Sequence, residues 1–494
     1  MLESIKQLLK ALDENNITYC HWKSNEHLKP ALEGDTDLDM LFLPEERVSL
    51  EKVLSNCGLK RFRTVPRCQY NAIEDFIGYD SKKAKIWHLH LHYRMTLGEK
   101  NLKGYTVNTW GKYILHNRVY SKLGCYTSMP EDELILLYVR MALKLRISDY
   151  FFKTSMDDII ELKWLKNRIN IETLKKEAYM FCGKRGCKEI LKLFNMNLTH
   201  KRDLQKLQNI MIKYLKPYTS YNSIEASFYS LMRTIYNGFG GLNRHFHLNM
   251  PIPTRRVSPS GGSVIAILGS DGAGKSTTLE YISKELSKKL DIYNVYMGSG
   301  DGSCSILRWP MKLIAKKVGG KGLGESVTIE EASCIQSGKK LSVKAKLYSV
   351  AKIIWAVTLA YEKKSKICQI TKARNRGMIV LIDRYPQTYM SGISDGPLLS
   401  KYMNSNNLIL RFLAKKEKKA YEFAAINPPD LFIKLKVPAE LALARKPEMT
   451  LDEILLKQNV VENMYTNIRN VEIDTSKSKE ETFSLAMDSV WEVI

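Results

Sequence analysis

Short continuous runs of hydrophobic residues recur through the second half of the chain, each followed closely by glycine, proline or charged residues. They lie within residues 264–268, 378–386, 430–437 and 471–474. Runs of this length without a polar face are typical of strands that are buried on both sides in a parallel sheet. Helical spacing follows the first run over 277–290, and a final helix is expected after the last run. This pattern predicts an α/β fold in which helices flank a parallel sheet.

The first half of the chain has a different pattern. Residues 17–126 mix short strands and helices, whereas apolar residues recur at helical spacing from Ser128 to about Phe246. Ser128 and Glu131 together predict a capping box at the start of this helical part. We therefore expect an α+β domain with a helical extension. An amphipathic helix is also expected at the start of the chain, with Leu2, Ile5, Leu8, Leu9 and Leu12 on one face.

A break in both patterns separates the two halves. The stretch NMPIPTRRVSPSGG, residues 249–262, has three prolines, two arginines and a serine-glycine run in place of any helical or strand period. Proline removes backbone donors and glycine loosens the chain, so this composition is typical of a linker. We predict an α+β domain over 1–126, a helical domain over 127–248, the linker over 249–262 and an α/β domain over 263–494.

Composition limits the classes of protein. A chain of 494 residues with 44% apolar residues is too long for one hydrophobic core and is expected to be globular. Its net charge of +24 is spread along the chain, which favours a lysine-rich surface around phosphate-binding sites over a nucleic-acid partner. The nine cysteines, odd in number and scattered, are expected to be reduced core residues.

The hydrophobic stretches are too short for a membrane protein. Apart from the strand at 264–268, the longest apolar stretch, residues 353–361, is about half a membrane span. The N-terminus lacks a positively charged start followed by an apolar stretch. We expect no transmembrane segment and a cytoplasmic protein.

The sequence ILGSDGAGKSTT, residues 267–278, carries the clearest chemistry. It satisfies the GxxxxGK[ST] pattern between a predicted strand and a predicted helix. Backbone N–H groups of such a loop surround phosphates at the positive end of a helix, while the lysine reaches the β and γ phosphates and the hydroxyl ligates Mg²⁺. ATP and Mg²⁺ are therefore the predicted cofactors. The predicted nucleotide-binding residues are Gly269, Asp271, Gly272, Ala273, Gly274, Lys275, Ser276 and Thr277.

A second functional position is predicted at the end of the run MIVLIDRYP, residues 378–386. Asp383 and Arg384 stand at the C-terminal end of a buried strand, where open α/β sheets bind ligands. A carboxylate there suits a metal or a nucleophilic hydroxyl, and a guanidinium suits an acceptor phosphate. A salt-bridged strand end is the structural alternative.

These motifs together resemble the thymidylate kinase family. GSDGAGKSTT, RGMIVLIDRYP, PDLFIKLKVPAELALARK and EIDTSKSKEETFSLAMDSVWEVI occur in that family's order and approximate spacing over about 230 residues. The resemblance implies that Lys275 and Ser276 contact ATP and Mg²⁺, that Asp271 lies near the acceptor sugar, and that Asp383 and Arg384 hold the acceptor phosphate. It also implies that Arg445 is the first arginine of a mobile lid, and it is compatible with a homodimer through this domain.

Two departures from the family concern the acceptor. The chain has QTYMSGISDGP after DRYP, and residues 359–364 contain no arginine where such kinases place one against the nucleotide. These elements normally grip thymidine monophosphate. The acceptor is therefore expected to be a nucleoside monophosphate or a related phosphorylated molecule such as a sugar phosphate.

The N-terminal part contains a carboxylate pair in LEGDTDLDMLF, residues 32–42. Asp37 and Asp39 are two apart in a predicted strand and would share one face, as divalent-metal ligands do in nucleotidyl transfer. The pattern resembles the nucleotidyltransferase superfamily, with Lys23 and Ser24 where that superfamily has a glycine-serine pair. His90 stands where a third carboxylate is expected, so the predicted metal ligands are Asp37, Asp39 and His90, and the change from oxygen to nitrogen favours a softer ion than Mg²⁺.

The strand IWHLHLHYR, residues 86–94, places three histidines on one face, for which the structural alternative is a solvated sheet face. Either this domain uses a different metal, or it binds without reacting.

The interpretation we favour is Mg²⁺-dependent phosphoryl transfer from ATP to a nucleotide-like small molecule. The predicted catalytic residues are Lys275, Asp383, Arg384 and Arg445, with Asp37 and Asp39 for an accessory nucleotidyltransferase activity. One alternative is a nucleotidyltransferase that modifies RNA or another acceptor. Divergent kinases of this kind are associated with bacterial surface polysaccharide synthesis, and a non-catalytic nucleotide-binding component of such an assembly is the other alternative.

Overall fold

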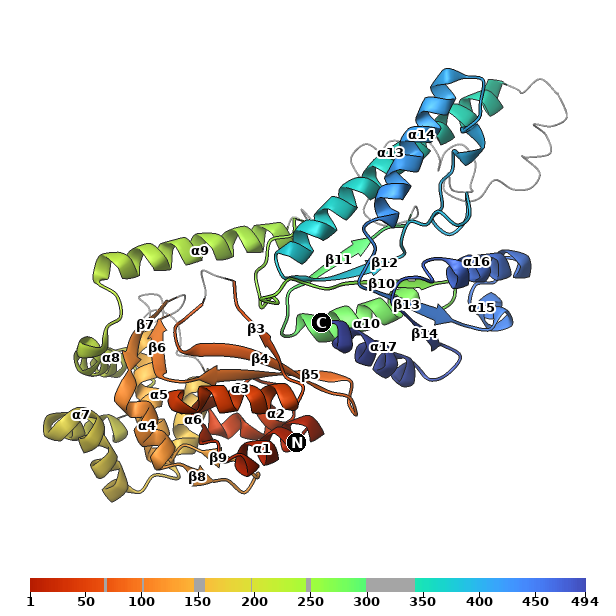
Figure 1. Cartoon of the computed structure of the whole chain (residues 1–494). Coiled ribbons are helices and arrows are strands. Elements are labelled where there is room, and N and C mark those ends of the chain that lie inside the picture. Colours follow the sequence, from red (N-terminus) through yellow and green to blue (C-terminus); the bar gives the residue numbers. More distant parts are fainter. Residues whose placement is uncertain (66–68, 100–101, 146–155, 197, 246–249, 299–342) are drawn as a thin grey trace. The chain divides into compact units, whose positions relative to one another are not determined.

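The computed structural model describes residues 1–65, 69–99, 102–145, 156–196, 198–245, 250–298 and 343–494. The chain divides into two compact units (Figure 1). Unit 1 consists of Met1–Leu248 with Thr254–Arg256, and unit 2 consists of Asn249–Pro253 with Val257–Ile494.

Unit 1 is built on a mixed sheet. Its described strands follow the order β3-β4-β5-β2-β1-β9-β8, in which β2 and β5 are parallel and pair Asp39 with His90. This register places the predicted aspartate and histidine side by side. The strands are β1 (Tyr19–His21), β2 (Leu38–Phe42), β3 (Lys60–Phe62), β4 (Ile73–Asp80), β5 (Lys85–His92), β8 (Val119–Tyr120) and β9 (Tyr126–Thr127), with a separate hairpin of β6 (Met95–Glu99) and β7 (Leu102–Val107).

Helices surround this sheet and continue into the helical part. The N-terminal helix α1 buries Ile5, Leu8, Leu9 and Leu12, as its amphipathic pattern predicts. One hydrophobic core extends from Trp22 and Leu41 near the sheet into the helices that follow residue 127, such as Leu137. The helices are α1 (Glu3–Glu14), α2 (Leu28–Leu32), α3 (Arg47–Asn56), α4 (Asn108–His116), α5 (Pro130–Lys144), α6 (Met156–Lys166), α7 (Ile171–Phe194), α8 (Lys201–Leu215) and α9 (Ser223–His245).

The predicted capping box at the start of the helical part is wrong. Helix α5 begins at Pro130 with Met129 as its N-cap residue, and no side chain caps it. The hydroxyl of Ser128 instead donates to the backbone oxygen of Trp22, and Glu131 accepts from the backbone N–H of Asn170. Both side chains therefore hold tertiary contacts, which the local sequence pattern does not reveal.

Unit 2 is the predicted α/β fold. In the described residues its sheet has the order β11-β12-β10-β13-β14, and every neighbouring pair is parallel. The strands are β10 (Val264–Gly269), β11 (Ile292–Tyr296), β12 (Ile379–Asp383), β13 (Leu431–Lys436) and β14 (Asn470–Asp474). The four predicted strands are found, and β11 is an additional edge strand whose partly polar sequence did not predict it.

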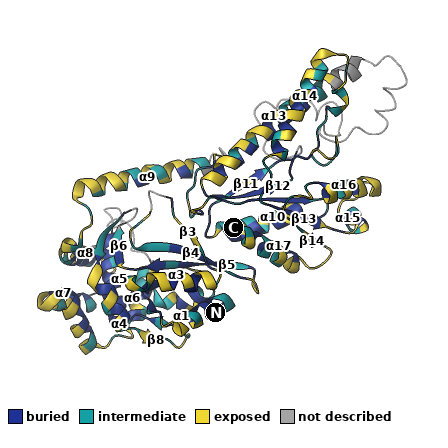
Figure 2. Cartoon of the chain, viewed as in Figure 1, coloured by how far each residue is buried: buried dark blue, intermediate teal, exposed yellow. Residues whose placement is uncertain are grey.

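Helices lie on both faces of this parallel sheet, with α10 and α17 along one face and α13, accompanied by α14, along the other (Figure 1). They are α10 (Lys275–Ser287), α13 (Val343–Asn375), α14 (Leu408–Ala425), α15 (Ala439–Arg445), α16 (Leu451–Asn463) and α17 (Lys479–Val493). Figure 2 shows that the outer faces of the helices are exposed, while the central strands β10, β12 and β13 are mostly buried. Strands β12 and β13 flank β10 on its two sides, so the loops after these strands meet at one edge of the sheet.

The proline-rich stretch between the halves is attached to both units. Arg256 donates to Asp75 of unit 1 at 2.8 Å, while Val257 is buried in the core of unit 2 and Ser258 pairs with the backbone of Gly377. The chain therefore passes between the units within one or two residues.

Two other expectations can be compared with the structure. Among the six described cysteines, Cys20 and Cys125 are buried, whereas Cys368 is exposed, and all six are free. The expectation of core cysteines is therefore only partly right. Within the described ranges, no helix combines the length and hydrophobicity required to cross a membrane.

Candidate functional site

The loop between β10 and α10 has the backbone that its glycines permit. Gly272 and Gly274 have φ of 81° and 87°, in the left-handed region that L side chains rarely adopt. A Cβ at Gly272 would also lie 2.8 Å from the backbone oxygen of Ala442. Gly274 is the N-cap residue of α10, so the first N–H groups of this helix face the loop. Ser276 and Thr277, in the first turn of α10, are exposed.

Lys275 is buried at the start of α10, with 7% of its surface exposed. Its ammonium group donates to the backbone oxygen of Ser270 at 2.7 Å and lies 3.7 Å from a carboxylate oxygen of Asp271. Burial lowers the pKa of Lys275 to about 8, and the charge of Arg384 acts in the same direction. Any further negative charge nearby would therefore stabilise the charged form of this lysine.

Three cations surround the carboxylate of Asp271. Arg384 donates to its Oδ1 at 2.9 Å, Lys457 donates to its Oδ2 at 2.6 Å, and Lys275 is the third. Burial alone would raise the pKa of Asp271, but these cations hold it well below its usual range. Three cations thus converge on this one carboxylate.

Asp383 and Arg384 lie at the C-terminal end of β12, in register with Ile267 of β10. Arg384 has φ of 67°, an uncommon conformation for a non-glycine residue, and its backbone N–H donates to Ile267. Burial raises the pKa of Asp383, and among the residues that the structure describes its Oδ1 atom is buried without a hydrogen-bond partner. Both residues therefore face the end of β10 from which the glycine-rich loop starts.

The divergent segment after DRYP contributes an acidic side chain that the sequence analysis missed. Asp395 lies 3.7 Å from Arg384 and 3.5 Å from Lys363 of α13. The Lys363 side chain is 3% exposed and also donates to the hydroxyl of Tyr421 at 3.3 Å. Gln387 fixes the turn that brings Asp395 back, because its amide group donates to the backbone oxygens of Met390 and Ile393. A buried lysine thus lies on the helix where the family has an arginine.

Arg445, at the end of α15, reaches the glycine-rich loop. It donates to the backbone oxygen of Gly272 at 3.0 Å and to that of Thr475 at 3.1 Å. A pocket at this edge of unit 2 is lined by Asp271, Lys275, Arg384, Asp395 and Lys457 together with apolar residues. The structure therefore gathers most of the predicted residues of unit 2 and adds Lys457, Asp395 and Lys363. No short motif marks these three residues, although Lys457 follows a capping box that predicts its helix.

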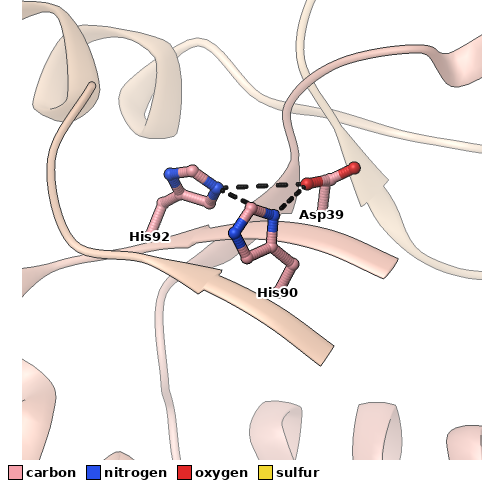
Figure 3. A group of neighbouring side chains, drawn as sticks. All are labelled: Asp39, His90 and His92. Carbon is pink, nitrogen blue, oxygen red and sulfur yellow. Dashed lines mark hydrogen bonds and ion pairs between the residues drawn. The ribbon is translucent and has the colours of Figure 1, made fainter. Parts of the chain in front are cut away.

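The predicted metal residues of unit 1 are only partly together. Asp39, His90 and His92 form one group, shown in Figure 3, in which the Nδ1 atom of His90 lies 2.7 Å from Oδ1 of Asp39. Asp37 precedes β2 and is outside this group, because it pairs with His88 at 3.0 Å and lies 3.8 Å from Arg256. The joint role of Asp37 and Asp39 as metal ligands stays a prediction.

The structural alternative of a solvated sheet face for the histidines is wrong, because His88 and His92 are 0% and 1% exposed. Burial lowers the pKa of His90 to about 4, so its imidazole is neutral near pH 7. Lys23 lies 2.8 Å from Oδ1 of Asp39 and supplies the nearest positive charge. Without two carboxylates at one point, this group does not reproduce a two-metal nucleotidyltransferase centre.

The loop that carries Lys23 and Ser24 is held by buried polar residues of the helical part. Ser24 has φ of 55°, and its hydroxyl accepts from Arg140 at 3.0 Å. Glu133 accepts from both the backbone and the side-chain amide of Asn25, at 2.8 and 2.7 Å. Burial raises the pKa of Glu133 to about 8. These contacts fix the position of the loop from helix α5.

Comparisons of the sequence with known proteins return relatives that match 46% of the chain. No family model matches the chain. The chain is 28% identical over 235 residues to the uncharacterized ATP-binding protein YghR of Escherichia coli (strain K12), a match that covers 46% of this chain and 86% of that protein. It is 26% identical over 229 residues to the uncharacterized ATP-binding protein YghS of the same strain, covering 46% of this chain and 92% of that protein. Both relatives are thus named as ATP-binding proteins.

Comparisons of the structure return solved kinases with low scores. A deoxyadenosine kinase from M. mycoides with bound dCTP matches at a TM-score of 0.24 and 15% identity, covering 47% of this chain and all of that chain. A sugar kinase from Janibacter sp. matches at a TM-score of 0.21 and 13% identity, covering 47% of this chain and 95% of that chain.

Proposed function

We propose that unit 2 binds ATP and transfers its terminal phosphoryl group to a small phosphorylated acceptor, of which a nucleoside monophosphate is the first candidate. The observation that supports this most directly is the set of three cations, Lys275, Arg384 and Lys457, around the single carboxylate of Asp271. Phosphate oxygens can replace carboxylate oxygens as partners of these cations, and the glycine-rich loop offers backbone N–H groups beside them.

Each part of the site has a role in this proposal. The loop and Lys275 hold the β and γ phosphates of ATP, and Arg384 holds the phosphate of the acceptor. Arg445, which already contacts the loop at Gly272, neutralises charge that builds up on the transferring group. Phosphoryl transfer of this kind depends on positioning and electrostatics rather than on a covalent intermediate, which suits a site made of fixed charges.

The residues present fit a magnesium ion. In the described part of the chain the buried Oδ1 atom of Asp383 has no hydrogen-bond partner, which suits an outer ligand of the ion, and the hydroxyl of the exposed residue Ser276 suits a direct ligand. When bound, Mg²⁺ supplies positive charge to the phosphates. In this proposal Asp383 also accepts a hydrogen bond from an acceptor hydroxyl or from water, because its buried Oδ1 atom has no hydrogen-bond partner among the described residues.

The acceptor is the least defined part of the proposal. Asp395 and Lys363 replace the residues with which thymidylate kinases grip their substrate, and they form a buried ion pair beside Arg384. A buried ammonium with a hydroxyl neighbour can hydrogen-bond a base carbonyl or a sugar hydroxyl. For this reason both nucleoside monophosphates and sugar phosphates belong among the acceptors to be tested.

The test is ADP production by the full-length chain with MgATP and a panel of nucleoside monophosphates and sugar phosphates. We expect one class of acceptor to stimulate ADP release, and Lys275→Ala to abolish it. Lys284→Ala is the matched control, because Lys284 is an exposed lysine on the same helix α10. The proposal is contradicted if no acceptor raises ADP formation above the level of Lys275→Ala.

A further inference from the structure

The histidine group of unit 1 has the geometry of a metal site. The Oδ1 atom of Asp39 is 2.7 Å from Nδ1 of His90 and 3.9 Å from Nε2 of His92, and the two nitrogens are 3.3 Å apart (Figure 3). A point equidistant from the three atoms lies roughly 2 Å from each, which matches the bond lengths of Zn²⁺ to nitrogen and oxygen. We propose that Asp39, His90 and His92 bind one divalent transition-metal ion of the zinc type.

The three ligands belong to the interior of a sheet and not to loops. Asp39 lies in β2 and is paired with His90 of β5, and His92 follows two residues later on the same face. Side chains on adjacent paired strands are held at a fixed spacing by the ladder of backbone hydrogen bonds. The convergence of these three side chains is therefore built into the register of the sheet.

Hydrogen bonding alone does not satisfy the group. In one arrangement, Nδ1 of His90 carries a proton and donates it to Asp39. This nitrogen then has no second proton to donate to Nε2 of His92, which lies 3.3 Å away. In the other arrangement, Nε2 of His92 donates to Nδ1 of His90, which accepts with its lone pair. Nδ1 of His90 then carries no proton, so it donates no hydrogen bond to the carboxylate oxygen of Asp39 at 2.7 Å. One ion that accepts a lone pair from each of the three atoms removes this conflict.

The donor set selects the class of ion. Two imidazole nitrogens and one carboxylate suit Zn²⁺ and its transition-metal neighbours, whereas Mg²⁺ prefers a shell made only of oxygen atoms. Lys23 places its ammonium group 2.8 Å from the same carboxylate oxygen and is 21% exposed. A bound ion and this ammonium group compete for Asp39, and the long lysine side chain can turn towards solvent. Lys23 is thus the competitor of the metal, and the site is independent of the function proposed for unit 2.

The experiment uses the full-length chain without an affinity tag, titrated with Zn²⁺ by calorimetry and with Co²⁺ by visible absorption. We expect one ion per chain, and Co²⁺ bands in the visible range because its spectrum reports bound nitrogen ligands. Asp39→Asn and His92→Gln should each weaken binding more than tenfold. His27→Gln is the control, because His27 is half-exposed and lies outside the group.

A second variant keeps all three ligands, in case the buried His92→Gln does not fold. Lys23→Met removes the competing ammonium group and should tighten Zn²⁺ binding at least threefold. The proposal is overturned if the chain binds no Zn²⁺, if Asp39→Asn binds it as tightly as the unchanged protein, or if Lys23→Met leaves the affinity equal or weaker.

Discussion

The charged side chains of the unit 2 site form ion pairs with one another, and bound phosphates would change these ion pairs. Asp271 pairs with Arg384 and Lys457, and Asp395 pairs with Arg384 and Lys363. Each cation that turns towards a phosphate must leave a carboxylate, so these ion pairs compete with the ligand. The arrangement keeps the cations ordered before a phosphate binds.

Replacing Arg384 should affect the acceptor more than ATP. Arg384→Met removes the guanidinium group that we assign to the acceptor phosphate, so we expect the KM for the acceptor to rise at least tenfold. The Kd for ATP should change less than threefold, because the loop and Lys275 remain. Steady-state kinetics with ATP and acceptor varied separately measure both. Arg374→Met is the control, since Arg374 is an exposed arginine whose partner Asp430 lies at the start of β13. An unchanged acceptor KM would contradict the assignment.

The lowered pKa of Lys275 predicts a pH dependence of ATP binding. In the free protein this pKa is about 8, because burial and Arg384 disfavour the charge. Bound phosphate favours the charged form and raises the pKa, so affinity is complete below about pH 8 and is lost as the pH rises towards the pKa of the complex. From pH 7 to pH 9 we expect the Kd to rise by about tenfold.

Isothermal titration calorimetry at the two pH values measures this change, and uptake of a proton on binding at pH 8 is a second indication. Lys275→Ala should bind weakly with a Kd that hardly depends on pH in this range. An equal Kd at both pH values for the unchanged protein would show that Lys275 does not titrate on binding.

Secondary-structure elements bring to the site what no local motif could reveal. The strands at 264–268, 378–386, 430–437 and 471–474 could be predicted, because a strand buried on both faces is a continuous apolar run. The glycine-rich loop follows the first of these strands, and Asp383 and Arg384 lie at the end of the second. The approximate positions of both were therefore predictable as well. Lys457 contacts Asp271 across 186 residues, and only the packing of α16 against the sheet reveals it.

Strand registers and helix caps were also harder to predict, because they too depend on contacts between residues distant in sequence. The pairing of Asp39 with His90 depends on which strands are neighbours, and a capping box at Ser128 was replaced by contacts with Trp22 and Asn25. In both cases residues distant in sequence decide the outcome, and a pattern of adjacent residues carries no information about them.

The capping box of α16 should stabilise the helix that carries Lys457. The hydroxyl of Thr450 accepts from the backbone N–H of Glu453, and the carboxylate of Glu453 accepts from the N–H of Thr450. Thr450→Ala should lower the free energy of local opening by about 1 kcal/mol, because it leaves one helix-terminal N–H unpaired. Hydrogen–deuterium exchange of residues 451–463 measures this. Glu453→Gln retains the hydrogen bond from the backbone N–H of Thr450 and should change the free energy of local opening by less than about 0.5 kcal/mol. Equal exchange in both variants would exclude a stabilising role for the box.

At the scale of the whole molecule, the two candidate sites belong to separate units. Asp39, His90 and His92 lie in unit 1, and the residues around the glycine-rich loop lie in unit 2. The last change of unit along the chain is between Arg256, which contacts Asp75 of unit 1, and Val257, which is buried in the core of unit 2. Each site is thus made of residues from a single unit.

This separation predicts that substitutions at the two sites act independently. Lys275→Ala should abolish acceptor-dependent ADP formation and leave the Zn²⁺ affinity of the chain within about twofold, since residues without shared partners have additive effects. Asp39→Asn should weaken Zn²⁺ binding more than tenfold and leave the KM for ATP within the same range. The double variant Asp39→Asn with Lys275→Ala should show the sum of the two losses and no more. If Asp39→Asn instead changes kcat or KM more than fivefold while circular dichroism shows a folded chain, the two units are coupled, and the ion in unit 1 would then act on the reaction in unit 2.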